Sequence, residues 1–197
     1  MDSYDNLPDA KITPQGEISK IFLEMGIKSF KEACKHIHEI DYGYNSTYED
    51  DLILFKEKKG TCTTKHAIIA GLARELDIPL HKNVGVYKFS EDITTGVQEI
   101  LDKYHIPYIP MVHCFLVYDK YRFELTEGNN NGKKTSIENF IETKEVDPFI
   151  SRKDEYLWYK KVLKEKILPT DEMKGIKERS LLKAREESIK LLKKCIL

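Results

Sequence analysis

The chain has 197 residues, of which 41% are hydrophobic and 33% charged, and its formal net charge is -1. A chain of this size buries roughly 70% of the surface that it exposes when unfolded, so it needs neither disulfides nor a metal to hold a core. Its aromatic content excludes wholesale disorder, and its near-zero net charge argues against a nucleic-acid partner. No apolar run approaches the roughly 20 residues of a membrane span.

Hydrophobic spacing in the first half of the chain predicts mostly helices. In chain order the predicted elements are helices over 17–40 with a break at Gly26, a short helix over 51–58, a helix over 62–76, a strand over 83–89 and a helix over 94–104. Thr61 is a suitable N-cap for the helix over 62–76, and Pro79 prevents this helix from continuing.

The second half of the chain begins with a predicted hairpin and ends in predicted helices. Strands over 112–118 and 121–126 are joined at Asp119-Lys120, and a loop rich in Asn and Gly follows over 127–135. Thr135 and Glu138 form a capping-box pattern that predicts a helix through Thr143. The last two predicted elements are helices over 152–168 and 171–195.

Acidic and basic side chains are unevenly distributed along the chain. Residues 151–197 carry 14 basic and 8 acidic side chains, which leaves 18 basic and 25 acidic ones before residue 151. This asymmetry predicts an acidic body over 1–150, whose core spans about 52–126, and a basic helical extension over 151–197 that docks on the same domain.

The four cysteines, Cys34, Cys62, Cys114 and Cys195, form no CxxC pair. The N-terminal residues are polar and acidic, so we expect no signal peptide and a cytoplasmic protein with free thiols. Each thiol is then either part of the core or a nucleophile. We expect Cys34 and Cys114 to lie in the core and Cys195 to be inert at the end of a helix.

Cys62 differs because it occupies the predicted first position of a helix. The unpaired N–H groups of a first turn and the helix dipole both favour a thiolate over a thiol. The same N–H groups can hold the oxyanion of a tetrahedral intermediate. Without further support, a small buried side chain would be the commoner interpretation of such a cysteine.

The predicted hairpin supplies that support. If Tyr118 faces Tyr121, one face is wholly apolar or aromatic, and a slip of one residue would destroy the separation of the two faces. The other face carries His113, Phe115, Val117, Arg122, Glu124 and Thr126. Glu124 then lies opposite Phe115 and diagonal to His113, where a carboxylate can orient an imidazole.

Two residues compete for roles in this arrangement. His66 lies four residues after Cys62 on the same helix face, so it is a rival base or half of a metal pair, although a polar residue beside the cleft is the simpler interpretation. Asp119 is a rival to Glu124, but it lies in the predicted turn.

Gly60-Thr61-Cys62 at a helix start, the later Leu76-Asp77-Ile78-Pro79, Val112-His113 and Glu124-Leu125-Thr126 together resemble the transglutaminase-like superfamily. The resemblance implies a papain-related α+β fold in which the Cys helix packs on an antiparallel sheet, here with helical extensions at both ends. It also implies that Cys62 is the nucleophile, His113 the base and Glu124 the third member of a triad. The family more often has Asp than Glu at the third position, and a longer interval from the His.

These observations predict a cysteine-dependent acyl-transfer enzyme that hydrolyses an amide bond of a peptide or protein substrate. It would need no metal and no organic cofactor. The alternatives are a transglutaminase with an amine acceptor and a non-catalytic binding module on the same fold. An arylamine acetyltransferase also uses Cys, His and an acid, but it needs a longer chain.

Overall fold

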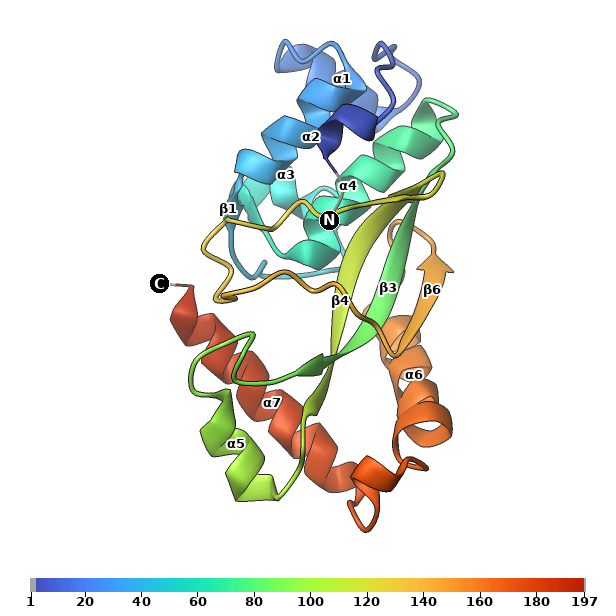
Figure 1. The fold of residues 1–197 in the computed structure, drawn as a ribbon. Helices are drawn as coiled ribbons and strands as arrows, with labels where there is room; N and C mark the ends of the chain where they lie inside the picture. Colours follow the sequence, from blue (N-terminus) through green and yellow to red (C-terminus); the bar gives the residue numbers. More distant parts are fainter. Residues whose placement is uncertain (1–2, 197) are drawn as a thin grey trace. The chain divides into compact units, whose positions relative to one another are not determined.

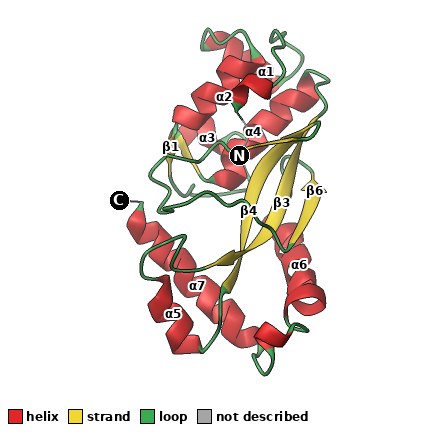
Figure 2. Cartoon of the chain, in the orientation of Figure 1, coloured by secondary structure: helices red, strands yellow, loops and turns green. Residues whose placement is uncertain are grey.

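The computed structural model describes residues 3–196, and the protein is of the α+β class (Figures 1 and 2). Its α-helices are α1 (Glu17–Glu24), α2 (Phe30–Glu39), α3 (Ile53–Glu57), α4 (Cys62–Glu75), α5 (Val97–Tyr104), α6 (Arg152–Val162) and α7 (Glu178–Cys195). Its strands are β1 (Asp41–Tyr42), β2 (Lys59–Gly60), β3 (Leu80–Phe89), β4 (Ile109–Tyr118), β5 (Tyr121–Phe123) and β6 (Glu142–Val146). Short helical turns are η1 (Tyr4–Asn6), η2 (Leu163–Ile167) and η3 (Asp171–Met173).

The main sheet is antiparallel, with its four strands in the order β5-β4-β3-β6. The predicted hairpin register is confirmed, because Tyr118 pairs with Tyr121 and Leu116 with Phe123. The connection is the predicted two-residue turn, with Asp119 at a φ of 53°. β1 and β2 form a separate parallel pair.

The chain divides into two compact units. Unit 1 comprises the chain up to Val84 together with Cys114–Asn129 and Glu145–Ile150, and unit 2 comprises Gly85–His113, Asn130–Lys144 and the chain from Ser151. The basic extension therefore belongs to a unit that also contains two earlier segments. The predicted division at residue 150 is one of the points where the chain passes from unit 1 to unit 2, but Gly85–His113 and Asn130–Lys144 of the predicted body also belong to unit 2.

In unit 1, α1, α2 and α3 all contact α4. Because α4 is surrounded, every residue from Thr64 to Ala73 is buried, rather than one face of the helix alone. The break predicted at Gly26 is confirmed by a φ of 80° there. The helix after it begins with a capping box, in which the Ser29 N–H donates to Glu32 and the Glu32 N–H donates to Ser29.

In unit 2, α7 packs against α5, and its buried face includes Leu181, Ala184 and Leu192. α6 packs its Tyr159 side chain inward, where the hydroxyl donates to the Pro110 carbonyl over 3.1 Å. The predicted helix 152–168 changes at residue 163 into the π-helical turn η2. The predicted helix 171–195 is shorter, because Gly175 has a φ of 82° and α7 begins only at residue 178.

The helix predicted through Thr143 is wrong. Residues 136–140 are irregular and continue into β6, at the edge of the sheet. The Ile141 N–H donates to the Val86 carbonyl over 2.7 Å, and Phe140 occupies the space that a side chain on Gly85 would fill. These long-range contacts with β3 outweigh the local capping signal.

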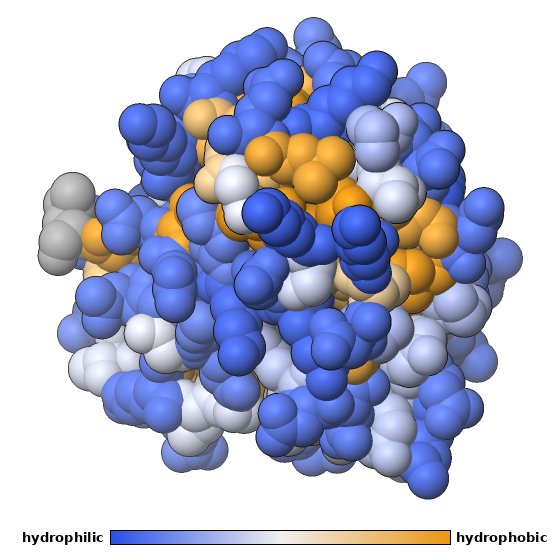
Figure 3. Space-filling model, turned by 90° about the horizontal axis from the view of Figure 1, so that it is seen from above, coloured by the Kyte–Doolittle hydropathy of each residue, from blue (hydrophilic) through white to orange (hydrophobic). Residues whose placement is uncertain are grey.

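Polar residues dominate the face of the molecule drawn in Figure 3, with apolar side chains gathered in smaller patches between them. No helix within residues 3–196 is both long enough and apolar enough to cross a membrane.

Candidate active site

Cys62 is the first residue of α4, as predicted, and its side chain is only partly buried. Thr61 precedes it in an extended conformation, with φ -88° and ψ -179°. The Thr61 N–H donates to Thr64 Oγ1 over 3.1 Å, which ties the residue before the helix to its first turn. The Cys62 thiol is thus held at the positive end of a 14-residue helix.

The other three thiols lie in different surroundings. Cys34 and Cys114 are buried, as predicted, and burial raises the pKa of the Cys34 thiol well above its usual range. Cys195 is exposed but is the last residue of α7, at the negative end of a helix dipole. Of the four cysteines, all within the described residues, Cys62 alone combines access to solvent with a helix N-terminus.

Glu124 directly follows β5 and is 6% exposed. Its Oε1 accepts a hydrogen bond from the Thr126 N–H over 2.7 Å and another from the Thr126 hydroxyl. The same oxygen lies 3.4 Å from Nε2 of His66, on α4. The carboxylate is therefore held in unit 1 by the Thr126 N–H and hydroxyl.

His66 is completely buried and connects α4 to the chain after β5. The Leu125 N–H donates to its Nε2 over 2.9 Å, so this nitrogen is an acceptor. Nδ1 then carries the proton and donates to the Cys62 carbonyl, 2.6 Å away. The imidazole is thereby fixed as the neutral Nδ1–H tautomer between α4 and the segment that carries Glu124.

These contacts overturn the interpretation of His66 as a polar residue beside the cleft. They also argue against its rival roles as the base or as half of a metal pair with Cys62, since both ring nitrogens have partners within the fold. Over residues 3–196 no group of three or more His, Cys, Asp or Glu side chains is arranged to hold a metal ion.

His113 lies on β4 and is 2% exposed. The Lys133 Nζ lies 3.2 Å from its Nδ1, and the Tyr87 ring meets the imidazole edge-on with 6.3 Å between ring centroids. The ammonium can donate only to an unprotonated nitrogen, so this contact fits a neutral imidazole. The sequence contains no signal for Lys133, which lies in the loop 127–135 and meets His113 only through folding.

The boundary between the two units passes between His113 and Cys114. Cys62 and Glu124 belong to unit 1, and His113 belongs to unit 2. The predicted pairing of His113 with Cys62 and with Glu124 would join the units, and it stays a prediction. The rival Asp119 is exposed in the turn.

Lys65, next to His66 on α4, is a buried cation that sequence reasoning missed. Its ammonium donates to the carbonyls of His38 and Ile40, at the C-terminal end of α2, and to Asn129 Oδ1. Three acceptors match the three N–H bonds of an ammonium group. The Asn129 amide also donates to the His38 carbonyl, so the start of the Asn-rich loop is anchored to α2.

Burial lowers the pKa of Lys65 to about 8, and the Asp41 and Glu124 carboxylates partly oppose this shift. Below pH 8 the lysine is protonated in both the folded and the unfolded chain. Between pH 8 and 10.5 the unfolded chain binds more protons, so this residue makes folding more favourable as the pH rises, by up to about 3 kcal/mol.

We therefore expect the free energy of unfolding of Lys65→Met, measured with urea, to lack this rise. The difference between wild type and variant should grow in favour of wild type from pH 8 to 10.5. Lys35→Met, which removes an exposed lysine of α2, is the matched control and should follow the wild-type pH dependence. A constant difference between wild type and Lys65→Met across this range would contradict the prediction.

Comparison with models of protein families, with curated proteins and with solved structures found no match for this chain.

Proposed function

We propose that the protein is a thiol enzyme that transfers acyl groups, with Cys62 as nucleophile, His113 as base and Glu124 as the third member of the triad. The observation that carries the proposal is the position of Cys62, a partly exposed thiol on the first residue of a long helix. The resemblance of Gly60-Thr61-Cys62, Val112-His113 and Glu124-Leu125-Thr126 to the transglutaminase-like superfamily supports it.

In the proposed reaction His113 accepts the proton of the Cys62 thiol, and the resulting thiolate attacks an amide carbonyl and forms a carbon–sulfur bond. The carbonyl electrons move to oxygen, and first-turn N–H groups of α4 stabilise the resulting oxyanion. When the intermediate collapses, the carbon–nitrogen bond breaks and protonated His113 gives its proton to the leaving amine. Water, deprotonated by His113, then hydrolyses the thioester and restores the thiol.

We favour a peptide or protein amide as the substrate and water as the acceptor, because hydrolysis needs no second binding site. The same acyl-enzyme with an amine acceptor would give a transglutaminase. We place the reaction in the cytoplasm, since Cys34, Cys62, Cys114 and Cys195 are all free thiols.

Thiol reactivity tests the proposal without a known substrate. Iodoacetamide at neutral pH should label Cys62 first, although Cys195 is more exposed. The helix N-terminus and the proposed imidazole partner of Cys62 both favour a thiolate. Peptide mapping gives the site, and Cys195→Ala is the control that should leave the labelling rate unchanged. Faster labelling of Cys195 than of Cys62 in the native protein would favour a non-catalytic module.

A further inference from the structure

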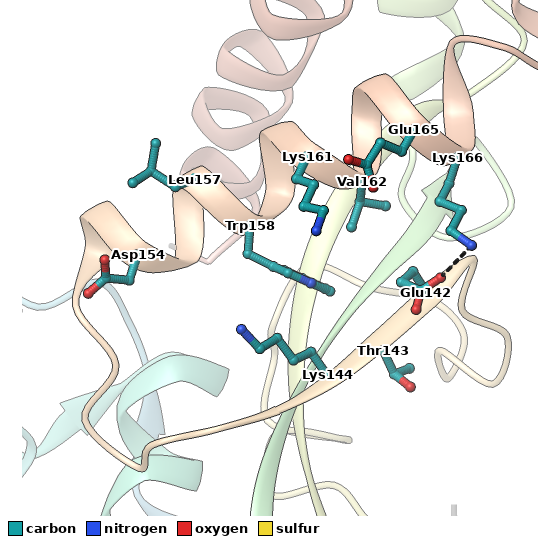
Figure 4. A pocket seen from close by; sticks show the side chains of 10 residues that line it. All are labelled: Glu142, Thr143, Lys144, Asp154, Leu157, Trp158, Lys161, Val162, Glu165 and Lys166. Carbon is teal, nitrogen blue, oxygen red and sulfur yellow. Dashed lines mark ion pairs between the residues drawn. The ribbon is translucent and has the colours of Figure 1, made fainter.

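Unit 2 contains an open groove of about 750 Å³ between β6 and α6. Figure 4 shows Lys144, from the strand, and Trp158 and Lys161, from the helix, directed into the same space. This volume lies within the range of pockets that bind ligands. All the residues that line the groove belong to unit 2, and none of them takes part in the proposed triad.

One wall of the groove is an open sheet edge. β6 is the last strand of the order β5-β4-β3-β6, so among the described residues β3 is its only neighbour. The main-chain N–H and C=O groups on its outer side are available to a further strand. Addition of an extended peptide to such an edge is a common mode of protein recognition.

The opposite wall has an apolar character that is unusual for the surface of this protein. Leu157 of α6 is 55% exposed, the highest value among the large hydrophobic side chains exposed in residues 3–196. Trp158 lies beside it in the sequence, and its ring extends into the groove (Figure 4). Together these side chains offer an apolar surface next to the open edge of β6.

The charges in the groove favour an anionic occupant. Lys144 and Lys161 approach the Trp158 ring from opposite sides (Figure 4), and neither forms an ion pair with another described residue. By contrast, Lys166 lies 3.7 Å from Glu142 and is neutralised there. An acidic side chain between the two lysines would relieve the repulsion between them.

The lining of the groove holds as many carboxylates as lysines, but its two other carboxylates lie away from the Trp158 ring, which Lys144 and Lys161 flank (Figure 4). Asp154 accepts a hydrogen bond from the Ser151 hydroxyl at the start of α6, where the helix dipole favours a negative charge. Glu165 belongs to the π-helical turn η2, and its side chain projects on the side of the helix away from Lys144 (Figure 4).

We propose that this groove binds an extended, acidic segment of a partner protein, which adds to β6 as a further strand. Its main chain pairs with β6, its acidic side chains meet Lys144 and Lys161, and an apolar side chain contacts Trp158.

Trp158 is the only tryptophan in the chain, so its fluorescence reports directly on the groove. The probe is a synthetic peptide of about seven residues that alternates Glu with Val and Thr, a length that covers the five-residue strand β6. We expect a saturable change in Trp158 emission. Lys144→Glu and Lys161→Glu should each raise the Kd roughly tenfold at low salt. Lys153→Glu, on an exposed lysine of α6 outside the groove, is the matched control and should leave the Kd unchanged.

N-methylation of the peptide separates strand addition from simple charge attraction. Successive N–H groups of a strand point to opposite sides. Methyl groups on one alternate set should therefore abolish binding, whereas methyl groups on the other set should be tolerated. Equal effects of the two sets would overturn the proposal, as would tighter binding of single-stranded DNA or inorganic phosphate than of the peptide. Absence of saturation up to about 1 mM peptide would also overturn it.

Discussion

Replacement of Cys62 by Ala should abolish acyl transfer, with turnover falling by roughly a thousandfold or more. The Cys62 sulfur is the atom that forms the covalent bond in the proposed reaction. We do not expect another thiol to replace it, since Cys34 and Cys114 are buried and Cys195 lies far away in the sequence. The assay uses 4-nitrophenyl acetate, an activated ester that acylates thiols. Wild type should release a burst of nitrophenolate equal to the amount of enzyme, and Cys62→Ala should show no burst.

His113→Ala should cause a loss of similar size, because the imidazole is the proposed proton carrier in both half-reactions. Cys195→Ala is the matched control, since it removes an exposed thiol without touching the proposed triad. A normal burst from Cys62→Ala would contradict the assignment of the nucleophile. If His113→Ala retained the burst while Cys62→Ala lost it, the thiol assignment would stand and the base would be a different residue.

Of two substitutions of Glu124, Glu124→Gln should lower activity more, whereas Glu124→Asp should lower stability more. Glu124→Gln keeps an oxygen that can accept from the Thr126 N–H and hydroxyl, so the fold should be retained. It loses the charge that stabilises an imidazolium, and kcat/KM should fall roughly a hundredfold or more. Glu124→Asp keeps the charge on a shorter side chain, so it should retain more activity but lose contact with Thr126 and become less stable.

The free energy of unfolding in urea and kcat/KM, both measured on the two variants, test this prediction. Asp119→Asn serves as the control, because Asp119 lies exposed in the turn and should affect neither quantity strongly. If Glu124→Gln retained full activity, the role of Glu124 would be confined to its contacts with Thr126. If Asp119→Asn lost activity and shifted the pH–rate profile instead, Asp119 would be the third member.

Local patterns were sufficient for the features of this protein that depend on neighbours in the sequence. The start of α4 follows from Thr61 before a helical apolar pattern, and that alone places Cys62 at a helix N-terminus. The hairpin register follows from the alternation of apolar and polar residues around Asp119-Lys120, because only one register separates the two faces.

The same patterns failed where a segment's partner is far away in the chain. Thr135 and Glu138 satisfy a capping pattern, yet the segment is extended into β6 because the Ile141 N–H bonds to Val86 and Phe140 packs on Gly85. A capping box contributes on the order of 1 kcal/mol, which is less than the combined free energy of pairing with β3 and packing a partly buried aromatic ring.

Tertiary structure alone decided the surroundings of the candidate catalytic residues. The sequence by itself determined that Cys62 begins a helix and that His113 lies on a strand whose hairpin partner leads directly into Glu124, although β5 ends at Phe123. Folding determined that His66 joins the Cys62 carbonyl to Leu125, and that Lys133 reaches His113 from 20 residues away. The physical reason is that these contacts depend on which surfaces α4 and the loop 127–135 meet, and no periodicity within either segment encodes its partner.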